Sequence, residues 1–356
     1  MAASNNKIIQ PTMNFNLWNR VVRALLFGGK PNYLIAFVTG RCDMNCALCC
    51  DASRGVRVVP EMDTASWGAA VSGASALLQL TITGGEPFLR DDLIDVISAM
   101  VESSGVPRVS INTNGSRPER IEETLSFLLK QFPHTDFAVA VSLDGPFEIH
   151  DRLRGRPGAG ASARETLNRL APYREIFSRF TVRLQSLLQP ANSGILETFL
   201  AETASWPRDF HEIIFPRDIN PELARKLLPV YRRLTLRELG RSSSRYSGKL
   251  EWRLYRAVAR QAARAVEMNR GFRCPAGGGL VEVLPDGTVL GCEIGRLKDR
   301  AAIGKVGNGK TLTDVVQGGP ARRFRGEIAG SCCCTFECAI ASRIVLHPTQ
   351  WFRLFG

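Results

Sequence analysis

Hydrophobic and polar positions alternate with two different periods between residues 32 and 215. Six runs have the apolar, β-branched composition of buried strands: Asn32–Thr39, Leu78–Thr83, Arg108–Thr113, Phe137–Leu143, Phe180–Leu188 and Phe210–Phe215. Five stretches between them have apolar residues at helical spacing: Thr64–Leu77, Asp91–Ser103, Pro118–Phe132, Ala163–Tyr173 and Ser193–Thr203. Helices between successive strands build βαβ units, which form a parallel sheet. The pattern predicts an α/β fold, a partial (βα)6 TIM-type barrel with its chemistry at the C-terminal ends of the strands.

Three further segments flank the predicted barrel. The N-terminal part has an amphipathic stretch, Phe15–Phe27. Residues 217–273 have a helical pattern and contain 15 Lys and Arg against 5 Asp and Glu. Five of these basic residues fall on one helical face: Lys249, Arg253, Arg256, Arg260 and Arg264. From Cys274 the chain becomes rich in Gly and Cys, and Pro285–Gly287 predicts a hairpin turn. We expect an amphipathic leader (1–31), the barrel (32–216), a basic helical connector (217–273) and a cysteine-rich C-terminal domain (274–356).

The composition is that of a globular protein. Of the 356 residues, 44% are hydrophobic and 22% charged, enough for a sizeable core. No run approaches the roughly 18 apolar residues of a membrane span, and the polar N-terminus does not resemble a secretory signal. We therefore expect a cytoplasmic protein with reduced thiols. The amphipathic Phe15–Phe27 segment and the Trp351–Phe355 tail leave peripheral contact with the anionic inner face of a membrane as an alternative.

The ten cysteines are clustered. They occur as Cys42, Cys46, Cys49 and Cys50, then Cys274 and Cys292, then Cys332, Cys333, Cys334 and Cys338. A disulfide framework does not suit a reducing compartment, so clustered cysteines there indicate metal ligands. The four His residues have no ligand spacing, which leaves sites of thiolates alone. Such sites suit zinc or iron–sulfur clusters.

Three cysteines lie on one loop directly after the first predicted strand. Cys42, Cys46 and Cys49 are spaced so that they can hold three irons of a [4Fe–4S] cube and leave the fourth iron open to a ligand. A structural zinc site needs four closed ligands instead, and the neighbouring Cys50 could supply a fourth only awkwardly. The spacing favours the three-ligand cluster, with Cys50 as an alternative third ligand.

A T-G-G-E-P turn, Thr83–Pro87, follows the second predicted strand. Its paired glycines bring backbone close to a ligand, and Glu86 can receive an ammonium group. The same turn also fits a plain connection in which Pro87 opens the next helix.

The order of these motifs resembles that of the radical S-adenosylmethionine (SAM) superfamily. After the cysteine loop and the G-G-E-P turn come N-T-N-G at 112–115, S-L-D-G at 142–145 and H-D-R-L-R-G at 150–155. The resemblance implies that Cys42, Cys46 and Cys49 bind the cluster and that its open iron takes the amino and carboxylate groups of SAM. The SAM site it implies consists of Gly84, Gly85, Glu86, Pro87, Asn114, Ser142, Asp144 and Arg154. For 150–154, a charged helix-cap network is an equal alternative.

The C-terminal cysteines resemble the auxiliary-cluster region of SPASM and twitch radical SAM proteins. The resemblance implies one auxiliary [4Fe–4S] cluster, with two as the alternative, and the predicted hairpin places Cys274 and Cys292 on paired strands. The expected ligands are Cys274, Cys292, Cys338 and one of Cys332 or Cys334. The remaining thiols, Cys50, Cys333 and the unused Cys332, are candidates to return a hydrogen atom to the substrate, or are inert buried thiols.

The resemblance implies an enzyme that reductively cleaves SAM to a 5′-deoxyadenosyl radical, which abstracts a substrate hydrogen atom. The electron would come from a donor such as flavodoxin or ferredoxin. We expect oxidation, epimerisation or crosslinking of a peptide or small molecule such as a sugar. The alternatives are a membrane-surface enzyme that modifies a lipid or lipid-linked substrate, and a zinc-bound structural or nucleic-acid-binding protein. Residues 217–273 either bind an acidic partner or form a solvated face, and no motif favours nucleic acid.

Overall fold

The computed structural model describes residues 30–47, 49, 59–217, 219–246, 250–268, 273–293, 301–329 and 334–351. The predictions for Phe15–Phe27, Cys50, Lys249, Cys332 and Cys333, and for the tail after Trp351, lie outside these residues. No helix within the described ranges is both long and apolar enough to cross a membrane.

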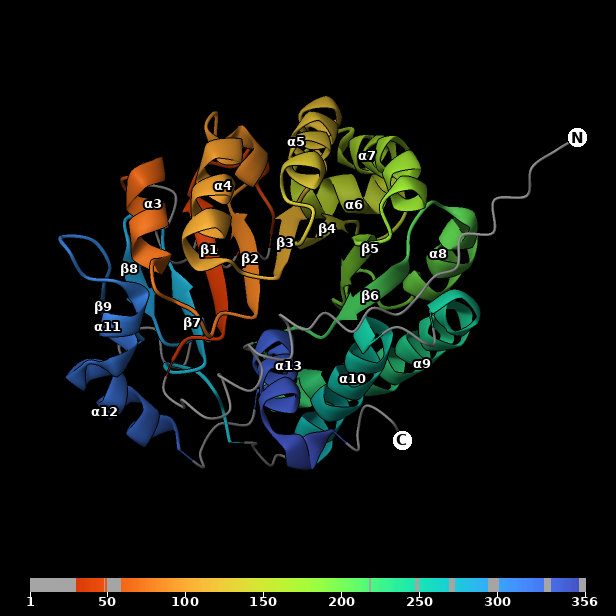
Figure 1. The fold of residues 1–356 in the computed structure, drawn as a ribbon. Coiled ribbons are helices and arrows are strands. Elements are labelled where there is room, and N and C mark those ends of the chain that lie inside the picture. Colours follow the sequence, from red (N-terminus) through yellow and green to blue (C-terminus); the bar gives the residue numbers. More distant parts are fainter. Residues whose placement is uncertain are drawn as a thin grey trace, which may run out of the picture.

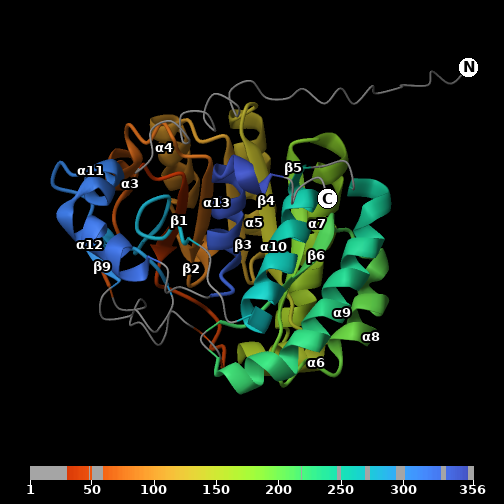
Figure 2. The same cartoon turned by 90° about the horizontal axis from the view of Figure 1, so that it is seen from below.

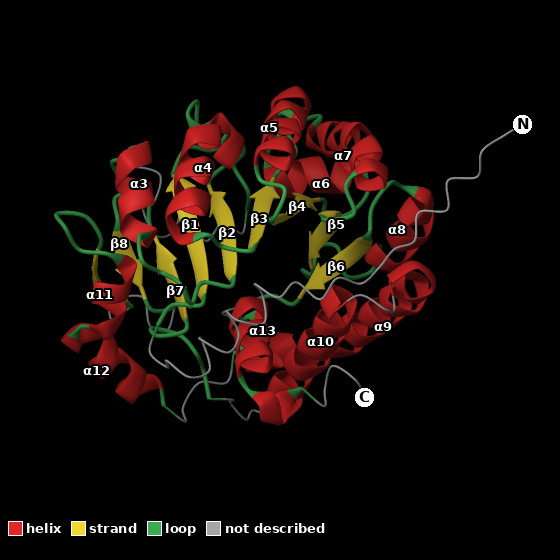
Figure 3. Ribbon diagram, viewed as in Figure 1, coloured by secondary structure: helices red, strands yellow, loops and turns green. Residues whose placement is uncertain are grey.

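A sheet of six parallel strands forms the centre of the structure, as predicted. The strands are β1 (Tyr33–Thr39), β2 (Gln79–Gly84), β3 (Arg108–Thr113), β4 (Asp136–Ser142), β5 (Phe180–Leu187) and β6 (Phe210–Ile214). They lie side by side in the order of the sequence, so each βα unit adds the next strand to the same edge. The barrel is open: β6 is at one end of the sheet, and it does not pair with β1. Figure 3 shows the sheet curving from β1 to β6.

Helices between the strands cover one side of this sheet. They are α3 (Thr64–Val71), α4 (Leu93–Ser104), α5 (Pro118–Gln131), α6 (Phe147–Arg154), α7 (Ala159–Ile176) and α8 (Leu196–Glu202), with short 3-10 turns η2 (Pro87–Leu89) and η3 (Thr203–Ser205). Figure 1 shows α3, α4, α5 and α7 along the same side of the strands. The sequence pattern did not predict α6 as a separate helix.

The two faces of the sheet differ in polarity. The outer face carries buried apolar side chains that share one core with the helices: Leu34, Ala36, Leu80, Ile82, Val109, Ile111, Val139 and Val182. The opposite face, here called the inner face, carries buried Ile35 and Phe37 together with several polar side chains at the alternate positions: Tyr33, Thr81, Ser110, Arg183, Gln185 and Glu212. Because side chains alternate along a strand, the outer face stabilises the fold and the inner face is left for polar groups.

The C-terminal part extends the same sheet. Strand β7 (Leu280–Val283) pairs parallel with β1, and β8 (Thr288–Leu290) and β9 (Ala302–Lys305) continue antiparallel. The predicted hairpin is present, with Gly287 at φ 88° in its turn. Cys274 and Cys292 do not lie on the paired strands as predicted; they flank the hairpin at its open end, because β7 and β8 are short.

Five further helices lie within the described residues after β6. They are α9 (Pro221–Tyr246), α10 (Leu250–Met268), α11 (Leu312–Gln317), α12 (Gly319–Ile328) and α13 (Glu337–Leu346), followed by the turn η5 (Pro348–Gln350). Helices α9 and α10 lie side by side in Figures 1 and 2, and α13 packs against α10. Of the predicted basic face, Arg260 and Arg264 are exposed on α10, while Arg253 and Arg256 are half-buried.

Candidate active site

The motifs of the sequence meet at one edge of the sheet. The cysteine loop follows β1, the G-G-E-P turn follows β2, and Asn114 and Asp144 follow β3 and β4. Since the strands are parallel, these four loops leave the sheet at its C-terminal edge. The structure therefore brings together the residues that the sequence predicted to share a site.

Three half-exposed thiols lie on the loop after β1. The Cys49 amide donates to the Cys46 carbonyl at 3.3 Å, which folds the loop back on itself. Burial raises the pKa of the Cys42 thiol to about 11, and burial also raises the pKa of Cys46, opposed by the positive charge of Arg154. The Arg154 guanidinium lies 4.0 Å from the Cys46 sulfur. Thiolates are the form that binds iron, so metal binding at this loop must release protons.

The two glycines of the G-G-E-P turn pack directly against this loop. The Gly85 amide donates to the Thr39 carbonyl at 2.9 Å, and the Glu86 amide donates to the Arg41 carbonyl at 2.8 Å. A Cβ atom on Gly84 would lie 2.3 Å from the Thr39 carbonyl oxygen. Backbone approaches this close admit only glycine. The turn therefore fixes where the cysteine loop leaves β1.

Glu86 is fully buried beside this turn. Its carboxylate accepts hydrogen bonds from the Thr113 hydroxyl at 2.8 Å and from the Asn114 amide at 2.7 Å, and a longer one from the Phe88 amide at 3.3 Å. Burial nevertheless raises its pKa to about 7. These bonds join the ends of β2 and β3. The predicted contact of Glu86 with an amino group stays a prediction.

Asp43, on the cysteine loop, connects three neighbouring segments. Its carboxylate accepts from the Asn114 side chain at 2.9 Å and from the Ser116 hydroxyl at 2.8 Å. Arg156 pairs with the same carboxylate and also donates to the Asp43 backbone carbonyl at 3.2 Å. These bonds hold the loop against β3 and against the segment after α6. Neither Asp43, which lies between two motif cysteines, nor Arg156, which directly follows the H-D-R-L-R-G motif, was predicted to contribute to the site.

A second polar network forms around Asp144, after β4. Arg154 donates to the Asp144 carboxylate at 2.8 Å, and the Leu187 amide donates to its other oxygen at 2.8 Å. The Asp144 amide donates to Nδ1 of buried His150 at 3.0 Å, and the Asn192 side chain donates to the Asp144 carbonyl at 2.9 Å. Burial lowers the pKa of His150 to about 4, so this imidazole is neutral at pH 7. Asn192 belongs to none of the predicted motifs and was not a predicted site residue.

The C-terminal end of α6 also touches the cysteine loop through its backbone. The Asn45 amide donates to the Arg154 carbonyl at 3.0 Å, and the Ala47 amide donates to the Leu153 carbonyl at 3.1 Å. Gly155 has φ 62°, and a Cβ atom there would lie 2.5 Å from the Asn45 carbonyl oxygen. The H-D-R-L-R-G motif is thus both the end of α6 and a wall of the site.

The donor set fits a [4Fe–4S] cluster held by Cys42, Cys46 and Cys49. All three thiols are accessible, lie on one loop, and each interacts electrostatically with a neighbour in the triad. Among the described residues, no three His, Cys, Asp or Glu side chains surround one point closely enough to hold a single ion. A four-iron cube binds each thiolate through a separate iron, so its cysteines need only border a common space.

The described C-terminal cysteines lie near the start of β1. Cys274 precedes β7 and Cys292 follows β8, while Cys334 and Cys338 lie before and at the start of α13. Cys292 and Cys334 are buried in the main core, and Cys274 and Cys338 pack against it. Which four cysteines bind one cluster stays a prediction.

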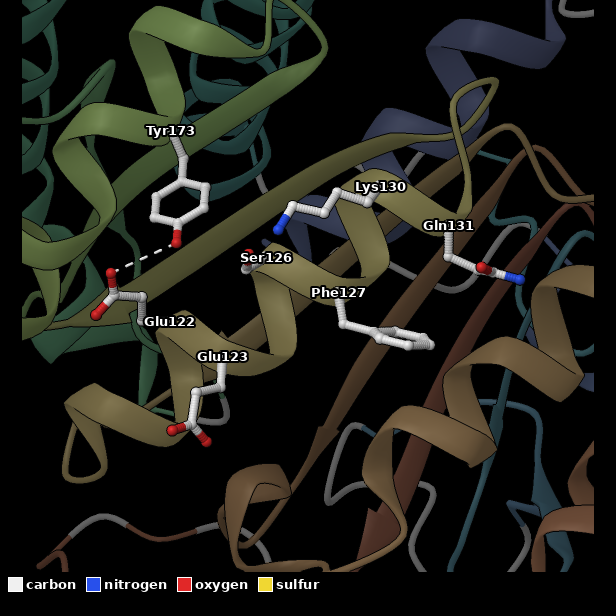
Figure 4. Close-up of a pocket in the computed structure, with 7 residues that line it drawn as sticks. All are labelled: Glu122, Glu123, Ser126, Phe127, Lys130, Gln131 and Tyr173. Atoms are coloured by element: carbon white, nitrogen blue, oxygen red, sulfur yellow. Dashed lines mark hydrogen bonds between the residues drawn. The ribbon is translucent and has the colours of Figure 1, made fainter.

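A cavity of about 630 Å³ on the outer surface contains none of these groups. Its lining residues are Glu122, Glu123, Ser126, Phe127, Lys130, Gln131 and Tyr173, from α5 and α7 (Figure 4). Within it, the Tyr173 hydroxyl donates to Glu122 at 3.4 Å. The cavity lies away from the cysteine loop, so it is not the candidate site.

Comparison with known families supports the reading of these motifs. The model of the radical SAM superfamily matches residues 37–182, from β1 into β5. The chain is 39% identical over 70 residues to the PqqA peptide cyclase of Gluconobacter oxydans, a match covering 19% of this chain and 20% of that protein. It is 30% identical over 138 residues to the sporulation killing factor maturation protein SkfB of Bacillus subtilis, covering 38% and 31%. The chain thus spans less than a third of the length of these curated relatives.

Two solved structures share the fold over most of the chain. Streptococcus suis SuiB bound to precursor peptide SuiA has a TM-score of 0.55 at 16% identity, covering 90% of this chain and 74% of that one. Native anSMEcpe with bound AdoMet and Cp18Cys peptide has a TM-score of 0.57 at 15% identity, covering 91% and 88%. At these identities the likeness concerns the fold.

Proposed function

We propose that this chain, which belongs to the radical SAM superfamily, abstracts a hydrogen atom from a peptide during its maturation. The single observation that carries the proposal is the meeting of Cys42, Cys46 and Cys49 with the G-G-E-P turn at one edge of the sheet. The product class is oxidation, epimerisation or crosslinking. The enzyme acts in the cytosol and takes its electron from a flavodoxin or ferredoxin.

A peptide substrate is favoured by the relatives. The names of PqqA peptide cyclase and SkfB refer to peptide maturation, and SuiB and anSMEcpe have been solved with bound peptides. These four proteins resemble this chain in sequence over part of its length or in fold over most of it. A peptide is therefore a stronger proposal than a sugar or a lipid.

The proposed cofactor site uses the loops at the C-terminal edge. Cys42, Cys46 and Cys49 would hold the [4Fe–4S] cluster, which would supply the electron for reductive cleavage of bound SAM. Gly84, Gly85, Glu86 and Pro87, with Asn114, Ser142, Asp144 and Arg154, form the SAM side of the site. Asp43 and Arg156 orient the loop through the bonds described above. Cys274, Cys292 and Cys338, with Cys332 or Cys334, hold the auxiliary cluster.

The inner face of the sheet provides polar groups for a substrate. Arg183 pairs with Glu212 at 3.4 Å and also bonds to Ser110, and Gln185 donates to Glu212 at 2.7 Å. These side chains lie on the side of the sheet away from α3, α4 and α5. Amide and charged groups of this kind can bind peptide backbone and polar side chains.

The test measures cofactors and hydrogen transfer together. Anaerobically purified chain is analysed for iron and sulfide and then incubated with SAM, dithionite and deuterated candidate peptides encoded by neighbouring genes. We expect deuterium in 5′-deoxyadenosine with one of these peptides. Replacing Cys42, Cys46 and Cys49 with alanine should remove about four irons per chain and abolish SAM cleavage. The control is Ser126→Ala, on the outer surface of α5. Sulfide content and SAM cleavage that survive the triple replacement would show the proposal to be wrong.

A further inference from the structure

Cys338 lies where the first strand of the sheet meets the last described helix. The Tyr33 hydroxyl, from β1, donates to the Cys338 sulfur at 3.3 Å. The same hydroxyl lies 3.1 Å from the Thr81 hydroxyl of β2. Because Tyr33 has one hydroxyl proton and gives it to sulfur, Thr81 is the donor in the second bond.

Arg217, just after β6, joins the segments that carry two of the C-terminal cysteines. Its guanidinium pairs with Glu293, the residue after Cys292, and with Glu337, the residue before Cys338, the latter at 2.9 Å. The guanidinium carbon also lies 4.2 Å from the centre of the Phe336 ring. One cation therefore holds together two segments that are more than forty residues apart in the sequence.

The backbone of β6 takes part in the same junction. One carboxylate oxygen of Glu337 accepts a hydrogen bond from the Phe215 amide at 3.1 Å. The other oxygen accepts from the Arg217 guanidinium at 2.9 Å. The Thr335 hydroxyl donates to the Pro216 carbonyl at 3.5 Å. The start of α13 is thus fixed to the end of β6 by charge and by hydrogen bonds, and Cys338 is fixed with it.

We propose that Tyr33 and Arg217 are positioning residues of the auxiliary cluster, which hold Cys338 beside Cys292 and raise the reduction potential of the cluster. An electron added to a cluster increases the negative charge on its cysteine sulfurs. A hydrogen-bond donor and a cation beside such a sulfur stabilise the reduced state. This inference rests on the part of the proposed function that assigns an auxiliary cluster to the C-terminal cysteines.

Removal of Arg217 has a second electrostatic effect. The carboxylates of Glu293 and Glu337 lose their shared cation, and both are largely buried, with side chains 9% and 10% exposed. Two carboxylates that have lost their shared cation, next to two ligand cysteines, oppose the addition of an electron and repel each other. Arg217→Met should therefore change both the potential and the retention of iron, whereas Arg217→Lys keeps the charge and restores part of each.

The first experiment isolates the Tyr33 hydroxyl. In a background where Cys42, Cys46 and Cys49 are alanine, the remaining cluster is titrated with dithionite and followed by electron paramagnetic resonance. Tyr33→Phe should weaken electron binding by the order of tenfold, or about 59 mV for a one-electron couple. The matched control is Thr81→Val, which removes the other partner of the hydroxyl and should leave the potential unchanged. An unshifted potential in Tyr33→Phe, with iron and sulfide intact, overturns the role of Tyr33.

The second experiment tests Arg217 through cluster retention. Loss of iron to an excess chelator is timed for the wild type, Arg217→Lys and Arg217→Met in the same background. We expect the fastest loss and the lowest potential for Arg217→Met, and intermediate values for Arg217→Lys. Wild-type retention and potential in Arg217→Met overturn the inference, whereas the proposed function is tested separately by SAM cleavage in the chain with its three loop cysteines intact. A background protein with no iron or sulfide overturns the auxiliary cluster itself.

Discussion

Replacing Gly85 with alanine tests whether the G-G-E-P turn sets the position of the cysteine loop. A Cβ atom on Gly85 would lie 2.1 Å from the Arg41 carbonyl oxygen and 2.9 Å from Cβ of Cys42. Real Cβ atoms essentially never approach another atom below 3.0 Å, so the backbones must move apart by about 1 Å. The move also lengthens the 2.8 Å bond from the Glu86 amide to Arg41. Such overpacking costs about 1–3 kcal/mol, and a 1 Å displacement of reacting groups slows catalysis by about 100-fold.

The assay for this variant is formation of 5′-deoxyadenosine from SAM and dithionite under anaerobic conditions. We expect Gly85→Ala to be slower by about 100-fold, with iron lost from the first cluster and retained in the second. The matched control is Gly194→Ala, whose added methyl group would meet no atom within 4 Å. If Gly85→Ala cleaves SAM at the wild-type rate with full iron content, the turn does not position the loop and the reasoning fails.

Three further changes test the surroundings of the site and the fold. Burial raises the pKa of Glu86 from its usual 4.5 to about 7, so its contribution to the stability of the folded protein is present at low pH and is lost as the pH rises through 7. Glu86→Gln should therefore flatten the fall in melting temperature of the iron-free protein between pH 5 and 8. An unchanged slope contradicts this. Arg156→Met should release the loop that Asp43 anchors and lower iron content without unfolding the chain, measured by iron analysis and circular dichroism. Arg174→Met removes the cation that lies 2.9 Å from the buried Asp209 carboxylate, in a pair whose side chains are both 5% exposed, and should cost about 3–5 kcal/mol in urea unfolding. A loss below about 1 kcal/mol would count against this.

The strands of the barrel could be predicted from the sequence because their outer face must be apolar. Each observed strand begins and ends within one residue of its predicted bounds, as in β3, where both ends coincide. The hairpin of β7 and β8 was predicted from its turn, but the parallel pairing of β7 with β1 was not, since β7 has only four residues and β1 lies more than 240 residues away. Helix α6 was missed because its eight residues were treated as part of a charged motif.

The residues of the site could be predicted from the sequence, but the hydrogen bonds between them could not. Motif spacing identified Cys42, Gly85, Glu86 and Asn114, and the parallel sheet then places them at one edge. Motif spacing could not predict that the Glu86 carboxylate accepts hydrogen bonds from Thr113 and Asn114, because these bonds depend on how β2 and β3 lie side by side. Contacts between Asp43 and residues more than 70 positions away likewise leave no local pattern.

Strand β1 relates the two cysteine regions to each other. Its C-terminal end leads into the loop of Cys42, while at its N-terminal end the Asn32 and Tyr33 amides both donate to the Gly279 carbonyl at 2.9 Å. Since β7 runs parallel to β1 and β8 returns beside it, Cys292 lies near this N-terminal end. A seven-residue strand spans about 20 Å, so the two proposed clusters are at opposite ends of that length. Under the proposed reaction, a peptide bound along the inner face would lie between SAM and the auxiliary cluster. This arrangement gives a reason for the polar side chains on that face, where a closed apolar core would be more stable.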